Sequence, residues 1–357
     1  MKKTKIVCTL GPASRDEKVL EKMLLNGMNV ARLNFSHGSH EYHKETIELF
    51  RKVRDKLQIP AAVMLDTKGP EIRLGDFENE EVTLSKGDLF TLTTKNILGN
   101  QEIVSITYKD LPSQLQMGNK ILIDDGKVSL EVVSSTITEL NCKVLVGGKI
   151  SNHKGVNVPN VHLNFEYLSQ KDKEDLKFGV ENDVDYIAAS FVRSKEDVKS
   201  LRNYLDYIGG KNIKIISKIE NIEGVDNFDE ILNSSDGIMV ARGDMGVEVE
   251  YERLPGLQKK FIRKCYQAGK VVITATQMLE SMIHSLTPTR AEITDVANAV
   301  FDGTSAIMLS GETAMGDHPD KVVKTMAKIA RQAENDALNL RVYDGIPHDN
   351  DIDDTTN

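Results

Sequence analysis

The sequence predicts an α/β protein built on a (β/α)8, or TIM, barrel, with a small antiparallel β-barrel lid domain inserted after the third barrel strand. Short apolar runs rich in Ile and Val alternate with amphipathic segments along residues 1–70 and again along 159–342. Such runs indicate buried parallel strands, and the amphipathic segments indicate the helices that cover them. Between 71 and 158 the apolar residues recur at every second position, which indicates antiparallel strands.

Three strand and helix units precede the insertion. Strands are expected at 6–10, 30–34 and 61–65. The first is followed by an amphipathic segment from Asp16 that ends at Asn26-Gly27, a signal for the end of a helix.

The inserted segment begins and ends at prolines, Pro70 and Pro159. Because proline fixes φ, we expect stiff hinges at both points. Turn signals such as Asp125-Gly126 separate the alternating runs inside the insertion.

Five further strands are expected after the insertion, with Ser169 and Ser194 as helix N-caps between them. The strands lie at 186–189, 271–275 and 306–309, and within 214–220 and 237–244. The last segment, 343–357, is acidic and polar without periodicity, so we expect a mobile tail.

Composition excludes several classes of protein. The net charge of -9 argues against nucleic-acid binding, which needs a basic face. No apolar segment reaches the roughly 20 residues that span a bilayer, so no membrane partner is expected. The cysteines, Cys8, Cys142 and Cys265, are far apart and lack metal-ligand spacing, which indicates a reducing cytoplasm.

Lys218, Glu220 and Asp244 suggest a metal-assisted site. Residues two apart in a strand point the same way, so Lys218 and Glu220 project together at the end of their strand. Asp244 follows the next strand and can share a divalent cation with Glu220. An ammonium group beside two carboxylates suits a metal-assisted reaction on an anionic substrate.

Polar residues follow nearly every predicted barrel strand, where barrel enzymes place their reactive groups. Taken alone, each has a structural interpretation: Asp244 fits a helix N-cap, Thr276 fits a cap for a helix near Met278, and Thr289 to Glu292 fits a capping box. Their coincidence favours an active site. The residues are Arg32, Asn34, Ser36, His37, Asp66, Thr67, Lys68, Ser190, Lys218, Glu220, Arg242, Asp244, Thr276, Ser310 and Glu312.

These stretches closely resemble the motifs of pyruvate kinase, from the first strand to about residue 340. Examples are Asp-Thr-Lys-Gly-Pro-Glu-Ile-Arg at 66–73 and Met-Val-Ala-Arg-Gly-Asp at 239–244. The other matching stretches are 8–14, 32–38, 154–157, 216–221, 274–282 and 308–314. The resemblance implies phosphoryl transfer from phosphoenolpyruvate to ADP, giving pyruvate and ATP in the last step of glycolysis.

By resemblance, Glu220 and Asp244 hold Mg2+ or Mn2+, a hard cation that prefers carboxylate oxygens. Lys218 neutralises the transferring phosphoryl group, while Arg32 and Arg73 clamp phosphate as guanidinium forks do. The substrate carboxylate meets the backbone N–H groups of Gly243 and Asp244, and Thr276 lies where the enolate gains a proton through a water relay. The nucleotide-binding residues are Asn34, His37, Arg73 and Lys154.

The resemblance also implies a K+ site formed by Asn34, Ser36, Asp66 and the Thr67 carbonyl, with Glu71 typical of K+-dependent members. The inserted domain, with Lys154 and Asp125, closes over the nucleotide and excludes water.

The sequence departs from the family at its end, since members normally continue beyond Asn357 into a domain with the effector site and subunit contacts. We therefore expect no allosteric control, and an assembly that is homo-oligomeric in the family but weakened or lost here. Smaller departures are Ser305, His318 and Leu286-Thr287. The alternatives are a catalytically weak phosphoenolpyruvate or nucleotide binder crippled by loss of that domain, and a barrel aldolase or lyase.

Overall fold

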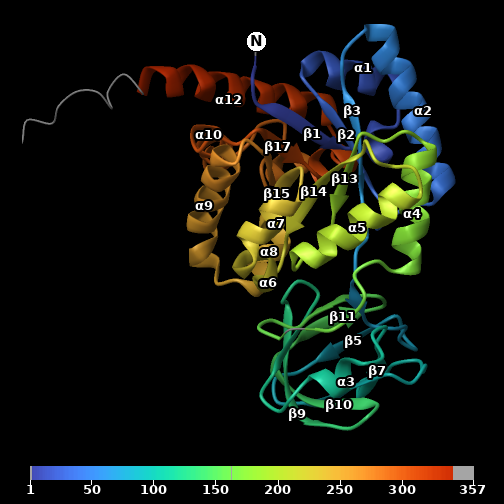
Figure 1. Ribbon diagram of the computed structural model, residues 1–357. Coiled ribbons are helices and arrows are strands. Elements are labelled where there is room, and N and C mark those ends of the chain that lie inside the picture. The colour runs from blue at the N-terminus through green and yellow to red at the C-terminus, as the bar shows by residue number, and fades with distance from the viewer. Residues whose placement is uncertain (1, 162, 341–357) are drawn as a thin grey trace, which may run out of the picture.

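The computed structural model describes residues 2–161 and 163–340, which form a (β/α)8 barrel and a smaller β domain (Figure 1). Eight parallel strands close the barrel in the order β1-β17-β16-β15-β14-β13-β3-β2. Every predicted barrel strand is confirmed, with shifts of one residue at β1 and β3. The strands are β1 Lys5–Thr9, β2 Val30–Asn34, β3 Ala62–Asp66, β13 Tyr186–Ala189, β14 Lys214–Ile219, β15 Gly237–Ala241, β16 Val271–Ala275 and β17 Ala306–Leu309.

Helices cover the outside of the barrel. The predicted caps are confirmed, because the Ser169 and Ser194 side chains accept hydrogen bonds from first-turn N–H groups and Gly27, with φ of 116°, ends the first helix. The helices are α1 Glu17–Asn26, α2 His40–Leu57, α4 Gln170–Glu181, α5 Lys195–Tyr207, α6 Ile222–Asp226, α7 Phe228–Ser234, α8 Arg242–Glu248, α9 Leu254–Gln267, α10 Arg290–Phe301, α11 Gly311–Ala314 and α12 Pro319–Leu340. Short 3-10 turns lie at Pro12–Ser14, Tyr251–Arg253 and Glu280–Ile283.

The barrel has two apolar layers, because alternate strand residues face its interior and its helices. The interior is filled by a small cluster that includes Met64, Ile216 and Met308. The larger core lies between strands and helices, where the rings of Phe228 and Phe261 stack at 4.0 Å.

The β domain has its own core and a curled seven-stranded sheet of order β4-β12-β8-β9-β10-β6-β7. The pairs are antiparallel as expected except β6 with β7, which is parallel. An antiparallel bridge from Leu74 to Ile106 joins its two edges, which gives the sheet its barrel-like form. The elements are β4 Ile72–Arg73, β5 Glu81–Leu84, β6 Leu89–Thr93, β7 Ile103–Ser105, α3 Leu111–Gln114, β8 Lys120–Ile123, β9 Val128–Ser135, β10 Glu139–Val146, β11 Gly148–Ser151 and β12 Gly155–Asn157.

The β domain lies at the carboxyl ends of the barrel strands, next to α6 and α8 (Figure 1). The chain enters it from β3 and leaves it after β12, so the insertion sits where barrel active sites form. Within the described residues no helix is long and apolar enough to cross a membrane. The predicted tail, 343–357, lies outside these residues.

The stacked pair in the outer core gives a stability prediction. Replacing Phe261 with Ala should lower the free energy of unfolding by about 3–5 kcal/mol, because a fully buried ring is lost and a cavity remains. Chemical denaturation followed by circular dichroism measures the change. The neighbouring exposed Lys260→Ala should shift it by less than about 0.5 kcal/mol; equal effects would contradict this packing.

Candidate functional site

The polar residues at the strand ends continue the inward-facing register of the barrel. On β14, Ile216 belongs to the interior cluster, and Lys218 and Glu220 follow it at intervals of two. The same alternation leads from Met64 to Asp66 and from Ala188 to Ser190. The apolar interior thus ends in a layer of polar side chains at the mouth of the barrel.

Four of these side chains, Arg32, Asp66, Lys218 and Glu220, form an ion cluster of two cations and two carboxylates. Asp66 accepts hydrogen bonds from Arg32 Nε at 2.6 Å and from Lys218 Nζ at 3.0 Å, and Lys218 Nζ lies 2.9 Å from Glu220 Oε1. None of the four is more than 8% exposed. An unpaired charge at this depth costs on the order of several kcal/mol, so each member depends on the others.

The cluster controls the charge of its members. Burial opposes ionisation of Asp66, but Arg32 and Lys218 outweigh it and lower the pKa of Asp66. Burial also opposes the charge on Lys218, but Asp66 and Glu220 raise the pKa of Lys218 above its usual value. At Glu220 burial dominates: it raises the pKa, Lys218 lowers it and Asp244 raises it, to about 8. Lys218 therefore stays charged, and at Glu220 the charge of Lys218 does not outweigh burial and Asp244.

Glu220 and Asp244 have the chemistry of a divalent-cation site. Asp244 lies in the first turn of α8, close enough for its charge to raise the pKa of Glu220. Both residues offer hard carboxylate oxygens, and burial together with Asp244 opposes the charge on Glu220 more than Lys218 favours it, so the residues fit Mg2+ or Mn2+. Among the described residues no three His, Cys, Asp or Glu side chains are grouped for a metal. A cation held by these two carboxylates would take its remaining ligands from other groups, such as water or substrate.

Ser190 connects the ion cluster to Thr67, a role that the sequence did not reveal. Its hydroxyl accepts from Lys218 Nζ at 2.8 Å and lies 2.6 Å from the Thr67 carbonyl and 3.1 Å from Asp66 Oδ1. Its position directly after a predicted strand was the available signal, but the sequence does not show which side chains it meets.

Thr276 faces α8 from the end of β16. Its Oγ1 accepts the Gly243 N–H at 2.8 Å and donates to the Ala275 carbonyl at 2.7 Å. Its φ of 69° is strained for a β-branched residue, and Arg242 holds this loop by donating to the Thr276 carbonyl at 2.6 Å.

Two structural interpretations of these residues are wrong. Thr276 does not cap a helix near Met278, where the N-cap of the following 3-10 turn is Leu279; its hydroxyl instead accepts the N–H of Gly243 in the first turn of α8. Ala241 rather than Asp244 is the N-cap of α8. The capping box from Thr289 to Glu292 is confirmed.

The oxygen atoms of the predicted K+ site lie at the neighbouring ends of β2 and β3. Asn34 pairs with Asp66 in the strand register, and Asn34 Oδ1 accepts the Ser36 N–H at 3.1 Å. The Thr67 carbonyl is bonded to Ser190. These oxygen donors suit a monovalent cation, although Asp66 is already shared with Arg32 and Lys218.

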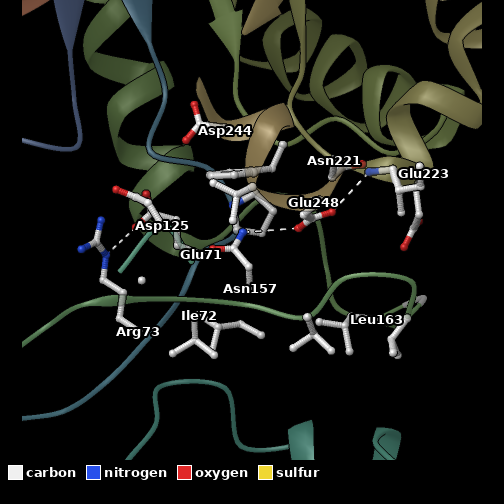
Figure 2. Close-up of a pocket in the computed structure, with 18 of the residues that line it drawn as sticks. Glu71, Ile72, Arg73, Asp125, Asn157, Leu163, Asn221, Glu223, Asp244 and Glu248 are labelled. Carbon is white, nitrogen blue, oxygen red and sulfur yellow. Dashed lines mark hydrogen bonds and ion pairs between the residues drawn. The ribbon is translucent and has the colours of Figure 1, made fainter. Parts of the chain in front are cut away.

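A cavity of about 340 Å³ lies between the β domain and the barrel (Figure 2). Arg73 and Lys154 line it from the β domain and Asp244 lines it from the barrel. Arg73 pairs with Glu71, and Lys154 Nζ lies 2.9 Å from Asp124 Oδ1. The ion cluster is not part of this lining, nor are the other two predicted nucleotide residues, Asn34 and His37 at the end of β2.

His43 supports the loop that carries His37. Its Nε2 lies 2.8 Å from the His37 carbonyl, and its ring stacks on Phe35 at 4.1 Å. Within the described part of the chain His43 Nδ1 is buried and has no hydrogen-bond partner. Burial lowers the pKa of His43, more than the neighbouring Asp175 raises it.

Fold and site together define a class of protein: a barrel enzyme whose mouth holds a buried lysine, a carboxylate pair fit for a divalent cation and a cavity covered by a second domain. A sequence model of the pyruvate kinase barrel domain matches residues 1–323. The chain belongs to the pyruvate kinase family.

Relatives named pyruvate kinase cover most of the chain. The protein from Clostridium perfringens is 52% identical over 335 residues, and the one from Clostridium acetobutylicum is 53% identical over 337. A relative from Staphylococcus haemolyticus is 53% identical over 336 residues. Each match covers 94% of this chain, but it spans 71% of the clostridial proteins and 57% of the staphylococcal one.

The neutral state of His43 gives a pH prediction. The pKa of His43 in the folded protein lies below its ordinary value. The neutral ring therefore contributes stability that is fully present above the ordinary pKa. This contribution is lost as the pH falls through the lowered pKa of the folded protein. We expect the free energy of unfolding to fall between about pH 7 and 5. His43→Gln should remove part of this slope in urea titrations. His284→Gln, at a side chain that is 81% exposed, should leave it unchanged; identical slopes in all three proteins would contradict the assignment.

Proposed function

We propose that this chain transfers the phosphoryl group of phosphoenolpyruvate to ADP, with uptake of one proton, giving pyruvate and ATP. The observation that carries the proposal is the charged Lys218, fixed between Asp66 and Glu220 beside Asp244 in a pyruvate kinase barrel. Negative charge is spread over the oxygens of the phosphoryl group during its transfer. Such a site therefore acts mainly by positioning the substrates and by supplying positive charge.

Glu220 and Asp244 would hold the divalent cation. When bound, Mg2+ or Mn2+ supplies positive charge for the carboxylate and enolate oxygens of the substrate. This assignment is supported by the raised pKa of Glu220, because a nearby cation would stabilise its ionised form.

Lys218 and Arg32 face the transferring phosphoryl group. Both are anchored on Asp66, so their charges are held in place before substrate arrives. A preorganised charge stabilises developing negative charge without the cost of reorienting solvent. Arg32 is fixed further by donating to Thr9 Oγ1 at 2.8 Å.

Thr276 takes the protonation step. Loss of the phosphoryl group leaves an enolate that must gain a proton at carbon. The Thr276 hydroxyl is a weak acid, so it passes a proton on from water rather than supplying one alone. The Gly243 N–H is bonded to this same hydroxyl, so a substrate carboxylate bound at Gly243 and Asp244 competes for that donor and frees the threonine.

The nucleotide lies between the β domain and β2. Arg73 and Lys154 supply positive charge from the cavity wall, and Asn34 and His37 meet the nucleotide from the opposite side. Because the last two lie outside the cavity lining, we infer that the β domain moves when the nucleotide binds. Asn34, Ser36, Asp66 and the Thr67 carbonyl would hold K+, which would add positive charge at this edge.

Removing the lysine charge tests the phosphoryl-transfer role. Lys218→Met should lower kcat by at least about 10²–10³-fold, the loss typical of a preorganised electrostatic group. A coupled assay with phosphoenolpyruvate, ADP, Mg2+ and K+ measures it, with circular dichroism to verify folding. Lys214→Met, at the exposed start of the same strand, is the matched control.

Three outcomes count against the proposal. Equal turnover in Lys218→Met and the unsubstituted chain would remove the role of the lysine. Absence of turnover in the unsubstituted chain, with Mg2+-dependent ligand binding in calorimetry, would favour the weak binder instead. Activity without ADP would favour the aldolase or lyase.

Exchanging the monovalent cation tests the K+ site. Replacing K+ by tetramethylammonium at constant ionic strength should lower kcat severalfold, because that cation is too large for the oxygen ligands at β2 and β3. Equal rates in the two salts would refute the role given to Asn34, Ser36, Asp66 and Thr67.

A further inference from the structure

Glu248, the last residue of α8, connects the barrel to the β domain (Figure 2). Its Oε1 accepts from Asn157 Nδ2 at 3.3 Å, and its Oε2 accepts from the Ile222 N–H at 3.2 Å. Asn157 ends strand β12 of the β domain, whereas Ile222 begins α6 of the barrel, two residues after Glu220. One carboxylate thus bonds to both domains.

The residues on either side of this contact belong to the proposed site. Asp244 and Glu248 are four residues apart on α8, one helical turn along the same face. On the other side, Lys154 directly precedes β12, and Gly155 of β12 pairs with Arg73 of β4. The strand pair that holds Asn157 therefore also positions Arg73 and Lys154, the β-domain cations that line the cavity.

A second approach supports the same docking geometry. A Cβ atom built on Gly126, in the turn between β8 and β9, would lie 3.9 Å from Val247 Cγ1 on α8. Two separate parts of the β domain, this turn and β12, therefore come to the same short helix.

We propose that Glu248 is a positioning residue that docks the β domain on α8 and so fixes Lys154 and Arg73 relative to Asp244. The proposal rests on the proposed function in that these residues serve nucleotide and metal. The domain position then sets how well ADP, rather than water, receives the phosphoryl group.

Exchange of donor and acceptor tests this contact. Asn157→Asp places two carboxylates together, so the KM for ADP should rise about tenfold, as expected for losing a hydrogen bond to a charged group. More phosphoenolpyruvate should also be hydrolysed per ATP formed. The double variant Asn157→Asp/Glu248→Gln restores a bond in the reverse direction, since the new side-chain amide at position 248 donates to residue 157 and its oxygen still accepts from Ile222. Both quantities should return to within about twofold of the unsubstituted protein.

A measurement without substrate separates this proposal from the proposed function. Spin labels at Met117→Cys in the β domain and Tyr207→Cys in the barrel occupy exposed positions, and the native cysteines are buried. The interlabel distance distribution should shift or broaden in Asn157→Asp and return in the double variant. Glu250→Gln, an exposed carboxylate beside α8, should change neither readout.

The outcomes are distinct. An inactive protein whose distance distribution follows the exchange supports docking and refutes the proposed function. An Asn157→Asp protein with unchanged distances and unchanged KM for ADP overturns the docking role. A double variant whose KM for ADP and distances stay at the values of Asn157→Asp overturns it as well.

Discussion

The burial of Lys218 between Asp66 and Glu220 is the constraint on which the rest of the site depends. Burying one such charge alone costs on the order of several kcal/mol, so the lysine is tolerated only where carboxylates reach it from both sides. Asp66 comes from β3, which β13 separates from β14, and Ser190 fills the gap from the end of β13. Barrel closure therefore brings these charges together, and the attraction between the opposite charges offsets the cost of burying them.

Two residues with strained backbone conformations lie at the mouth of the barrel. Phe191 has φ of 54° and donates its N–H to Glu220 Oε2 at 2.6 Å, and Thr276 has φ of 69° and accepts the N–H of Gly243. Such conformations cost on the order of 1–3 kcal/mol each and persist only where surrounding contacts enforce them. At both positions the backbone turn directs a polar group toward Glu220 or α8. The strain at these positions therefore lowers the stability of the barrel but helps to position the groups at its mouth.

The sequence predicted the barrel and the pairing of Lys218 with Glu220 because both follow from local periodicity. Runs of Val and Ile define buried strands, and an interval of two puts side chains on one face. Ser190 was named only as one of many strand-end residues and Glu248 was not assigned, because their contacts join segments distant in sequence: Ser190 meets Lys218, and Glu248 meets Asn157. His43 had only the stripe of its helix as a signal, and no pattern indicates that its ring supports the His37 carbonyl.

The chemistry of the Glu248 contact suits the movement of the β domain that we infer for nucleotide binding. Its carboxylate is bonded to an amide and to a backbone N–H, neither of which carries a net charge. Burial raises the pKa of Glu248, and Glu223 and Asp244 raise it too, whereas the hydrogen bonds from Ile222 and Asn157 lower it without outweighing burial. A buried ion pair broken here would leave an unpaired charge and cost about 3–5 kcal/mol, whereas a hydrogen bond to a charged group contributes about 1.5–3 kcal/mol. Enzymes whose lids open in every turnover need the weaker contact, because a tightly held lid retains product.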